Sequence, residues 1–87
     1  MADYRVRVAR SARKELKRLA RSIASRLIAR IEGLAQSPRP SGCAKLTGAG
    51  DLWRIRVADY RIVYAIDDEG LVVDVLIVRH RRDVYRQ

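Results

Sequence analysis

Apolar and polar residues alternate strictly in the first part of the chain, where residues 4–8 read YRVRV. Successive side chains of an extended chain point to opposite faces, so the apolar positions share one face and Arg5 and Arg7 share the other. The pattern predicts a short strand with one face in water.

The period then changes to that of a helix. One apolar set lies at i, i+4, i+7 and i+8 and consists of Ala12, Leu16, Leu19 and Ala20. A second set consists of Ile23, Leu27, Ile31 and Leu34. We expect Ser11 and Ser22 to be the N-caps of two helices, and residues 33–38 to end the second. The short link at residues 20–22 predicts an antiparallel helical hairpin.

Alternation returns after residues 37–51, a turn-rich segment that we expect to be irregular. Residues 52–57, LWRIRV, and residues 60–66, YRIVYAI, predict two strands joined by a two-residue hairpin loop. That loop pairs Arg56 with Arg61.

A further apolar run at residues 71–78, LVVDVLIV, predicts a third strand of the same meander, with Asp74 facing water. The order is therefore strand, two helices, three strands. It predicts one α+β domain over residues 1–87, with the helical hairpin on one face of a mainly antiparallel sheet.

Composition narrows the classes of protein that fit. The chain has 87 residues and is 48% hydrophobic, which is typical of a single folded domain. One cysteine, Cys43, and one histidine exclude an internal disulfide and a tetrahedral zinc site, so we expect no metal and no cofactor. No apolar stretch reaches the ~18 residues of a membrane span, and the N-terminus lacks an apolar signal core. We therefore expect a cytoplasmic protein that does not use a membrane.

The charge is strongly positive, with a formal net charge of +9 at pH 7. Such a field favours nucleic acid, an anionic membrane surface or an acidic protein as partner. Arginine greatly outnumbers lysine, which fits either codon bias or bidentate binding of phosphate. The basic face of the first helix, Arg13, Lys14, Lys17 and Arg18, fits either simple solvation or a share in binding a partner.

Candidate chemistry gathers at the end of the meander, where residues 79–86 read RHRRDVYR. The predicted hairpin also places Arg54, Arg56 and Arg61 on one sheet face, where neighbouring like charges are destabilising. Solvation or a bound anion would each account for that face. The register of the last hairpin is not fixed by the sequence, so either His80 or Arg81 could face Arg61.

The stretch from residue 45 to residue 86 resembles the RelE branch of the RelE/ParE toxin superfamily. The matching features are KL-x-G followed by a strand with Trp53, the D-Y-R-I-V-Y core at residues 59–64, and the H-R-x-x-V-Y ending at residues 80–85. The preceding strand and helical hairpin fit the order of that family as well.

The resemblance implies a small metal-independent ribonuclease that cuts messenger RNA in the ribosomal A site. The ribose 2′-hydroxyl attacks the adjacent phosphate, which requires a base, an acid and cations for the phosphorane. By position, Arg61 would clamp the phosphate, Arg81 would stabilise charge or assist the leaving group, and Tyr85 would be the base. His80 would act as acid or second base.

The family's best-known members have two strand lysines where this chain has Arg54 and Arg56. Arginine cannot in practice lose a proton, so these two residues are expected to bind phosphate and not to act as bases. Arg82 and Lys45 are further candidates for contact with the RNA backbone. Trp53 alternates with core positions, and base stacking is its alternative role.

The resemblance also implies partners: the ribosome, and a cognate antitoxin, expected to be acidic, through which the pair would bind operator DNA. Two other functions stay open. One is a ParE-like inhibitor of DNA gyrase on the same fold. The other is a basic nucleic-acid-binding module without catalysis, whose affinity would fall smoothly with salt.

Overall fold

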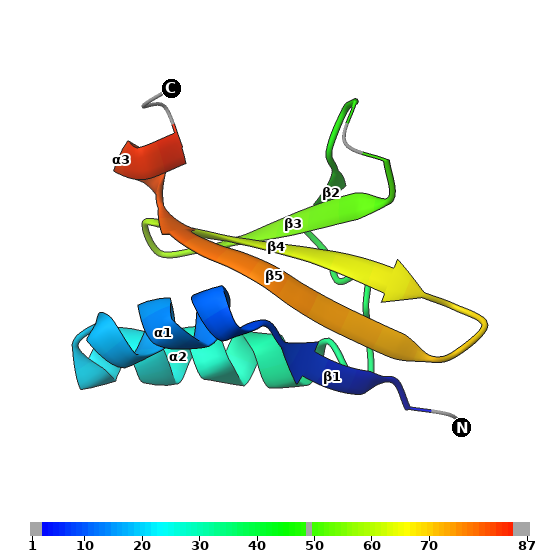
Figure 1. Cartoon of the computed structure of the whole chain (residues 1–87), viewed down its shortest axis with the longest axis horizontal. Coiled ribbons are helices and arrows are strands. Elements are labelled where there is room, and N and C mark those ends of the chain that lie inside the picture. The colour runs from blue at the N-terminus through cyan, green and yellow to red at the C-terminus, as the bar shows by residue number, and fades with distance from the viewer. Residues whose placement is uncertain (1–2, 49, 85–87) are drawn as a thin grey trace.

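The computed structural model describes residues 3–48 and 50–84, which form a helical layer against one face of a sheet (Figure 1). The elements in chain order are β1 (Arg5–Val8), α1 (Arg10–Arg18), α2 (Arg21–Gly33), β2 (Ala44–Lys45), β3 (Leu52–Val57), β4 (Tyr60–Asp67), β5 (Val72–His80) and α3 (Arg81–Val84). This arrangement confirms the predicted α+β class, the helical hairpin and the three-strand meander.

The sheet has the strand order β1-β5-β4-β3-β2. The meander is antiparallel, whereas β1 runs parallel to β5 at its edge. The two-residue loop is confirmed, because Val57 pairs with Tyr60 and Arg56 pairs with Arg61. Ala58 takes a positive φ of 54° in that loop. A short strand that we did not predict, β2, pairs with β3 inside the turn-rich segment.

Both predicted N-caps are wrong. The cap residues are Ala9 and Ala20, neither of which makes a side-chain cap hydrogen bond. At Ala9 the backbone is still extended and its N–H donates to the carbonyl of Val75, so β1 leads directly into α1. Ser11 is inside the helix instead, and its hydroxyl donates to the carbonyl of Leu76 at 3.3 Å. Sheet pairing therefore sets the start of α1, and a local capping signal does not.

The core lies between the helices and the sheet. Leu27, Ile62, Tyr64, Val73 and Val75 are 0% exposed. The predicted helix faces are confirmed in their main part, because Ala12 and Leu16 of α1 and Leu27 and Ile31 of α2 are buried. Fully burying one such aliphatic side chain stabilises the fold by about 1.5–3 kcal/mol. Ala20 is the exception, since it is exposed in the link between the helices.

One irregularity in β5 decides which side chains reach which face. Val63 pairs with Ile77 but its neighbour Tyr64 pairs with Val75, so Leu76 is an extra residue in the strand. Such a β-bulge moves all later residues of the strand to the opposite face. Val73 and Val75 are buried before the bulge, and Val78 is buried after it.

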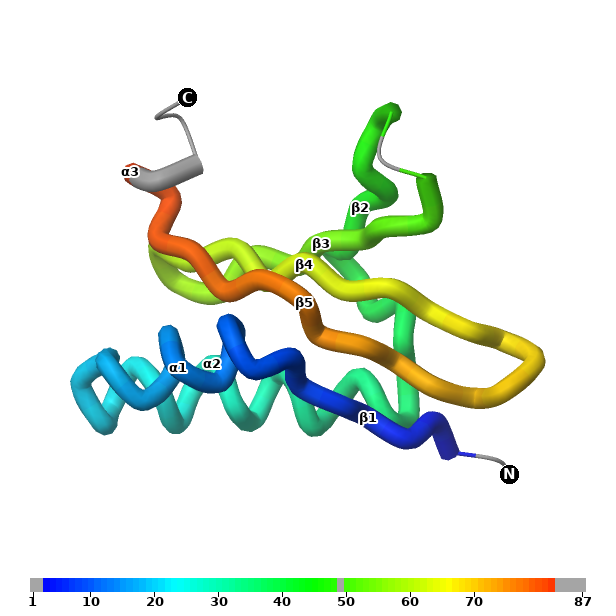
Figure 2. The backbone as a smooth tube through the Cα atoms, viewed as in Figure 1, coloured from blue at the N-terminus to red at the C-terminus, as the bar shows by residue number. Residues whose placement is uncertain are grey.

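Loops at the far end of the sheet are tied down by polar contacts. Asp68, in the β4–β5 turn, accepts hydrogen bonds from Arg39 at 2.8 and 3.2 Å and from the Tyr4 hydroxyl at 2.7 Å. Arg39 also lies over the Trp53 ring, with its Cζ 4.9 Å from the ring centroid. The buried hydroxyl of Tyr64 donates to the carbonyl of Pro38 at 2.7 Å. This end lies opposite the end that carries α3 (Figure 2).

Within residues 3–48 and 50–84, no helix is both long and apolar enough to cross a membrane.

Candidate active site

Four arginines gather on the sheet face that points away from the helices. Arg56, Arg61 and Arg79 are cross-strand partners on β3, β4 and β5, and Arg54 is two residues from Arg56 on the same face. We call these four residues the arginine cluster. Directly paired residues on neighbouring strands have Cβ atoms ~4.5–5.5 Å apart. The register thus places arginine side chains from three strands next to one another on this face.

This arrangement follows from alternation and from two hairpin registers. Ile55, Val57 and Ile62 point into the core, so the arginines between and beside them point outward. Val63 also faces outward, next to Arg54 in register, and is 5% exposed. The arginine side chains therefore lie beside partly apolar surface, where charge interactions are stronger than in open water.

No ion pair neutralises the arginine cluster within the described part of the chain. Asp74 is further along β5 on the same face, but its carboxylate is bonded to Arg7 at 2.7 and 3.1 Å. Arg54 donates a long hydrogen bond of 3.4 Å to the carbonyl of Gly42. Its pKa is lowered, first by burial and then by the charges of Arg56 and Arg61. A lowered pKa shows that the surroundings disfavour the cation, which a bound anion would relieve.

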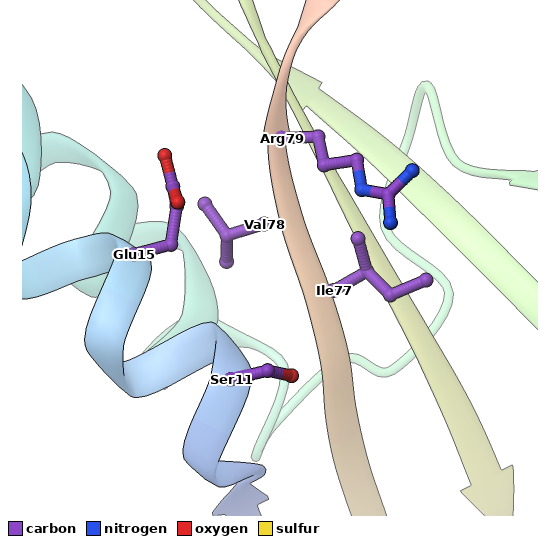
Figure 3. Close-up of a pocket in the computed structure, with 5 residues that line it drawn as sticks. All are labelled: Ser11, Glu15, Ile77, Val78 and Arg79. Atoms are coloured by element: carbon purple, nitrogen blue, oxygen red, sulfur yellow. The ribbon is translucent and has the colours of Figure 1, made fainter. Parts of the chain in front are cut away.

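Arg79 belongs to the arginine cluster but was not among the site residues predicted from the sequence. We ended the last strand at residue 78 and expected either His80 or Arg81 to face Arg61, but Arg79 is the cross-strand partner of Arg61. The bulge at Leu76 is the cause, because simple alternation from Val73 would turn Arg79 toward the core. The rule that arginine is almost never buried without a partner was the available signal. Figure 3 shows Arg79 and Ile77 pointing away from α1, while Val78 points toward it.

His80 consequently lies on the helix side of the sheet, away from the arginine cluster. Its ring meets the ring of Tyr60 edge to face, with centroids 5.1 Å apart. Its Nδ1 accepts a hydrogen bond from the backbone N–H of Arg82 at 3.1 Å. That contact satisfies one of the free N–H groups at the start of α3, as an N-cap side chain does. His80 and Tyr60 line a cavity of ≈ 280 Å³ together with Glu15 and Arg82.

Arg81 begins α3 and is held beside the β3–β4 turn. Its backbone N–H donates to the carbonyl of Asp59 at 2.6 Å, and its guanidinium lies 3.9 Å from the Asp59 carboxylate. Both side chains are largely exposed. Arg81 is therefore at the same end of the sheet as the Arg56–Arg61 pair, which is the second pair from this turn, after Val57–Tyr60.

The remaining predicted residues are more dispersed. Lys45 pairs in register with Trp53, which places it on the other sheet face from Arg54, and its ammonium lies 3.9 Å from Asp51. Arg82 is exposed beside His80. Trp53 packs against the core, and Arg39 covers one face of its ring. Tyr85, the predicted base, lies outside the described residues.

Two further features concern the chemistry around the site. A cavity of ≈ 330 Å³ lies where α1 covers the edge of β5 beyond β1, lined by Ser11, Glu15, Ile77, Val78 and Arg79 (Figure 3). Among the described residues, no group of three or more histidine, cysteine, aspartate or glutamate side chains is arranged to hold a metal ion.

Comparison with known proteins gives a consistent family. Residues 6–85 match the family model described as the ParE toxin of the type II toxin–antitoxin system parDE. Toxin RelG of Mycobacterium tuberculosis is 33% identical, over 97% of this chain and 98% of that protein. A candidate RelE-like toxin protein of Escherichia coli is 34% identical, over 94% of this chain and 90% of that protein. The RelE–RelB complex of Pyrococcus horikoshii contains a chain that is similar with a TM-score of 0.81 and 29% identity, over 98% of this chain and 99% of that one.

Proposed function

This chain belongs to the RelE/ParE superfamily of toxins from toxin–antitoxin systems, and we propose that it is an endoribonuclease that cuts messenger RNA in the ribosomal A site. The observation that carries the proposal is the arginine cluster. Guanidinium groups from three strands converge there without a neutralising carboxylate among the described residues. Such a surface is complementary to a phosphate, whose oxygens accept bidentate hydrogen bonds from arginine.

In the proposed reaction, the 2′-oxygen forms a bond to the adjacent phosphorus while the bond from phosphorus to the 5′-oxygen breaks. The 2′-proton passes to a base, and the departing 5′-oxygen takes up a proton from water. The products are a 2′,3′-cyclic phosphate and a 5′-hydroxyl. Charge grows on the phosphoryl oxygens during this step, and preorganised cations stabilise it. Arg61, at the centre of the cluster, and its neighbours Arg56 and Arg79 would hold these oxygens, so the step needs no metal.

The base, and a cation beside the leaving oxygen, would come from the C-terminal segment. We assign the base to Tyr85 and charge stabilisation near the leaving oxygen to Arg81, which lies next to the end of the arginine cluster. His80 enters the proposal as a positioning residue, because it faces the helices and accepts a hydrogen bond from the first turn of α3. Arg82 and Lys45 would contact RNA outside the site of cleavage.

A cognate antitoxin is the proposed protein partner. Solved relatives include toxin–antitoxin complexes, among them RelE–RelB of P. horikoshii. A net charge of +9 favours rapid association with an acidic chain. We propose that such a chain covers the arginine cluster and that the complex, not the toxin alone, binds operator DNA.

A second candidate function is inhibition of DNA gyrase, because the matching family model is described as the ParE toxin. The two functions can be distinguished by what happens to messenger RNA and to DNA supercoiling. A ribonuclease yields cut messages with defined 5′ ends, whereas a gyrase inhibitor blocks supercoiling and leaves messages intact. The RelE-named relatives and the arginine cluster favour the ribonuclease.

The decisive experiment is a translation extract supplied with wild type, Arg61→Ala or Arg26→Ala, followed by mapping of message 5′ ends. Arg26 is exposed on α2 and provides a control with the same loss of charge. We expect wild type and Arg26→Ala to cut, and Arg61→Ala to cut about 100- to 1000-fold more slowly, as when one transition-state donor is removed. Equal cleavage by wild type and Arg61→Ala, or no cleavage by wild type, would contradict the proposal.

A further inference from the structure

A second cationic surface lies on α1, in the helical layer and away from the arginine cluster. It consists of Arg10, Arg13, Lys14 and Lys17, which we call the α1 stripe. These positions are related by i, i+3, i+4 and i+7, the spacing that aligns side chains along one face of a helix. They line a groove of ≈ 570 Å³ together with Val8, and all four cations are exposed.

The α1 stripe has no carboxylate partner among residues 3–48 and 50–84. Among the described residues, its one side-chain hydrogen bond is a long one of 3.5 Å from Arg13 to the carbonyl of Val8. Glu15, the acid of the same helix, is 4.0 Å from Arg18 and lines other cavities. Neighbouring like charges at i, i+4 on a helix are destabilising. The stripe therefore keeps an unfavourable arrangement that a polyanion would relieve.

We propose that the α1 stripe binds the sugar–phosphate backbone of double-stranded RNA. A protein partner is the weaker fit, because protein interfaces are anchored by aromatic or aliphatic side chains in a dry centre. The groove offers only the half-buried Val8 for that purpose. A membrane surface would likewise need an apolar face to insert, which the stripe lacks.

The residues that line the groove also favour a duplex over a single strand. Proteins that bind single strands stack the exposed bases on aromatic rings, and no aromatic residue lines this groove. In a duplex the bases are stacked inside and phosphates and 2′-hydroxyls face outward. From Arg10 to Lys17 the stripe spans about 10 Å along the helix axis. Adjacent phosphates of one strand lie a few ångström apart, so that length matches about three phosphates.

The inference adds a contact with ribosomal RNA to the proposed function, and this ribosomal role of the stripe rests on that function. The arginine cluster would hold the message, and the α1 stripe, in the other layer of the fold, would hold structured ribosomal RNA. Binding of a duplex by the stripe is itself independent of cleavage, so the two proposals can fail separately.

The test is fluorescence anisotropy with a 2′-O-methyl RNA duplex of about 16 base pairs, a length that a double-stranded RNA-binding domain spans. The 2′-O-methyl group removes the nucleophile, so cleavage does not affect the result. The stripe variant is Arg13→Gln/Lys14→Gln/Lys17→Gln. The matched control is Arg21→Gln/Arg26→Gln/Arg30→Gln on α2, where all three arginines are exposed. Each variant lowers the net charge by three, from +9 to +6. Glutamine has a helix propensity similar to lysine and arginine, and thermal unfolding verifies the fold.

We expect the stripe variant to bind at least about tenfold more weakly at moderate salt. Its plot of log affinity against log salt should be shallower by about 2–3, at ~0.7–0.9 per lost phosphate contact. The α2 control should change that slope by less than about 1. Equal losses in both variants would show that net charge alone governs binding and would overturn the proposal. The proposal would also be overturned if the stripe variant lost affinity for poly-L-glutamate as strongly as for the duplex. That result would show that the surface favours an acidic polypeptide.

Discussion

The two faces of the sheet are made by the same strands and have opposite properties. Toward the helices, Ile62, Tyr64 and Val75 are 0% exposed and pack in a continuous core. Toward the other side, Arg56, Arg61 and Arg79 lie next to one another and form no ion pair with any of the described residues. Residues that are neighbours in sequence, such as Arg61 and Ile62, belong to different faces.

The difference separates stability from function. Burial of apolar surface is the main source of folding free energy, and it is concentrated on the helix side. Like charges held together across strands lower stability, so the arginine cluster is kept at a cost to the fold. Functional sites often carry such an unfavourable arrangement, and substitutions there can raise stability while removing activity. We first compare one substitution on each face and then consider smaller effects at Tyr64, His80 and Asp68.

The largest effect is expected on the helix side. Ile62→Ala removes a fully buried side chain and leaves a cavity, which should lower the free energy of unfolding by about 2–5 kcal/mol. Chemical denaturation measures this directly. A loss below about 1 kcal/mol would show that the core tolerates the gap and that the contrast between the faces is weaker than we infer.

Arg79→Ala tests the other face and the bulge that places Arg79 on it. We expect cleavage to slow by about 100- to 1000-fold, while the free energy of unfolding stays the same or rises. Arg79→Lys keeps a charge and should retain part of the activity, because it loses only the bidentate geometry. Activity in an extract and denaturation of the same samples provide both readouts. A variant that cuts normally would remove Arg79 from the site.

Tyr64→Phe should produce an intermediate effect on stability. The buried hydroxyl bonds to the carbonyl of Pro38, and leaving a buried acceptor unpaired costs about 1–3 kcal/mol. Burial raises the pKa of Tyr64 to about 12 from an ordinary value of 10.0. The folded protein therefore holds this proton more tightly, and the associated stability is lost as pH rises from about 10 to about 12. Wild type should lose more stability over that range than Tyr64→Phe, and parallel curves would contradict the assignment.

Substitution of His80 is expected to have a smaller effect, which is confined to the start of α3. His80→Ala removes the acceptor for the Arg82 N–H, and losing such a cap costs about 0.5–2 kcal/mol locally. We expect reduced cleavage at unchanged global stability, with activity largely restored in His80→Asn, because asparagine is a good N-cap. Activity lost equally in both variants would favour a direct chemical role for His80.

The smallest effect is expected at Asp68, in the β4–β5 turn. Hydrogen bonds from Arg39 first, and then from Tyr4, lower the pKa of its carboxyl group. Its contribution to stability is therefore present at neutral pH and is lost as pH falls below the ordinary value of 3.8. Asp68→Asn should reduce stability slightly at pH 7 and flatten the acid limb of the stability curve. Identical acid limbs in wild type and variant would show that these exposed contacts contribute nothing.

Much of the fold could be predicted because it depends on periodicity. Strict alternation gave β1, β3 and β4, and the two-residue loop fixed the pairing of Arg56 with Arg61. Features set by tertiary contacts could not be predicted. Ser11 carries a good capping side chain but bonds to Leu76, since α1 starts where β1 leaves the sheet.

The positions of the candidate site residues were predictable where they follow from alternation, as for the strands. Arg54, Arg56 and Arg61 share a face because of simple alternation, as expected. The positions of Arg79 and His80 depend on one extra residue in β5. The apolar run itself gives no sign of a bulge, and the signal in the sequence is Arg79, which simple alternation would bury. That single residue places Arg79 beside Arg61 and turns His80 toward the helices.

The most direct test of the central claim is a crystal structure with a short 2′-O-methyl RNA that cannot be cleaved. Our account predicts a bridging phosphate on the open face of the sheet, with guanidinium nitrogens of at least two of Arg56, Arg61 and Arg79 about 2.7–2.9 Å from its oxygens. RNA bound elsewhere, with no phosphate in contact with these three side chains, would contradict it.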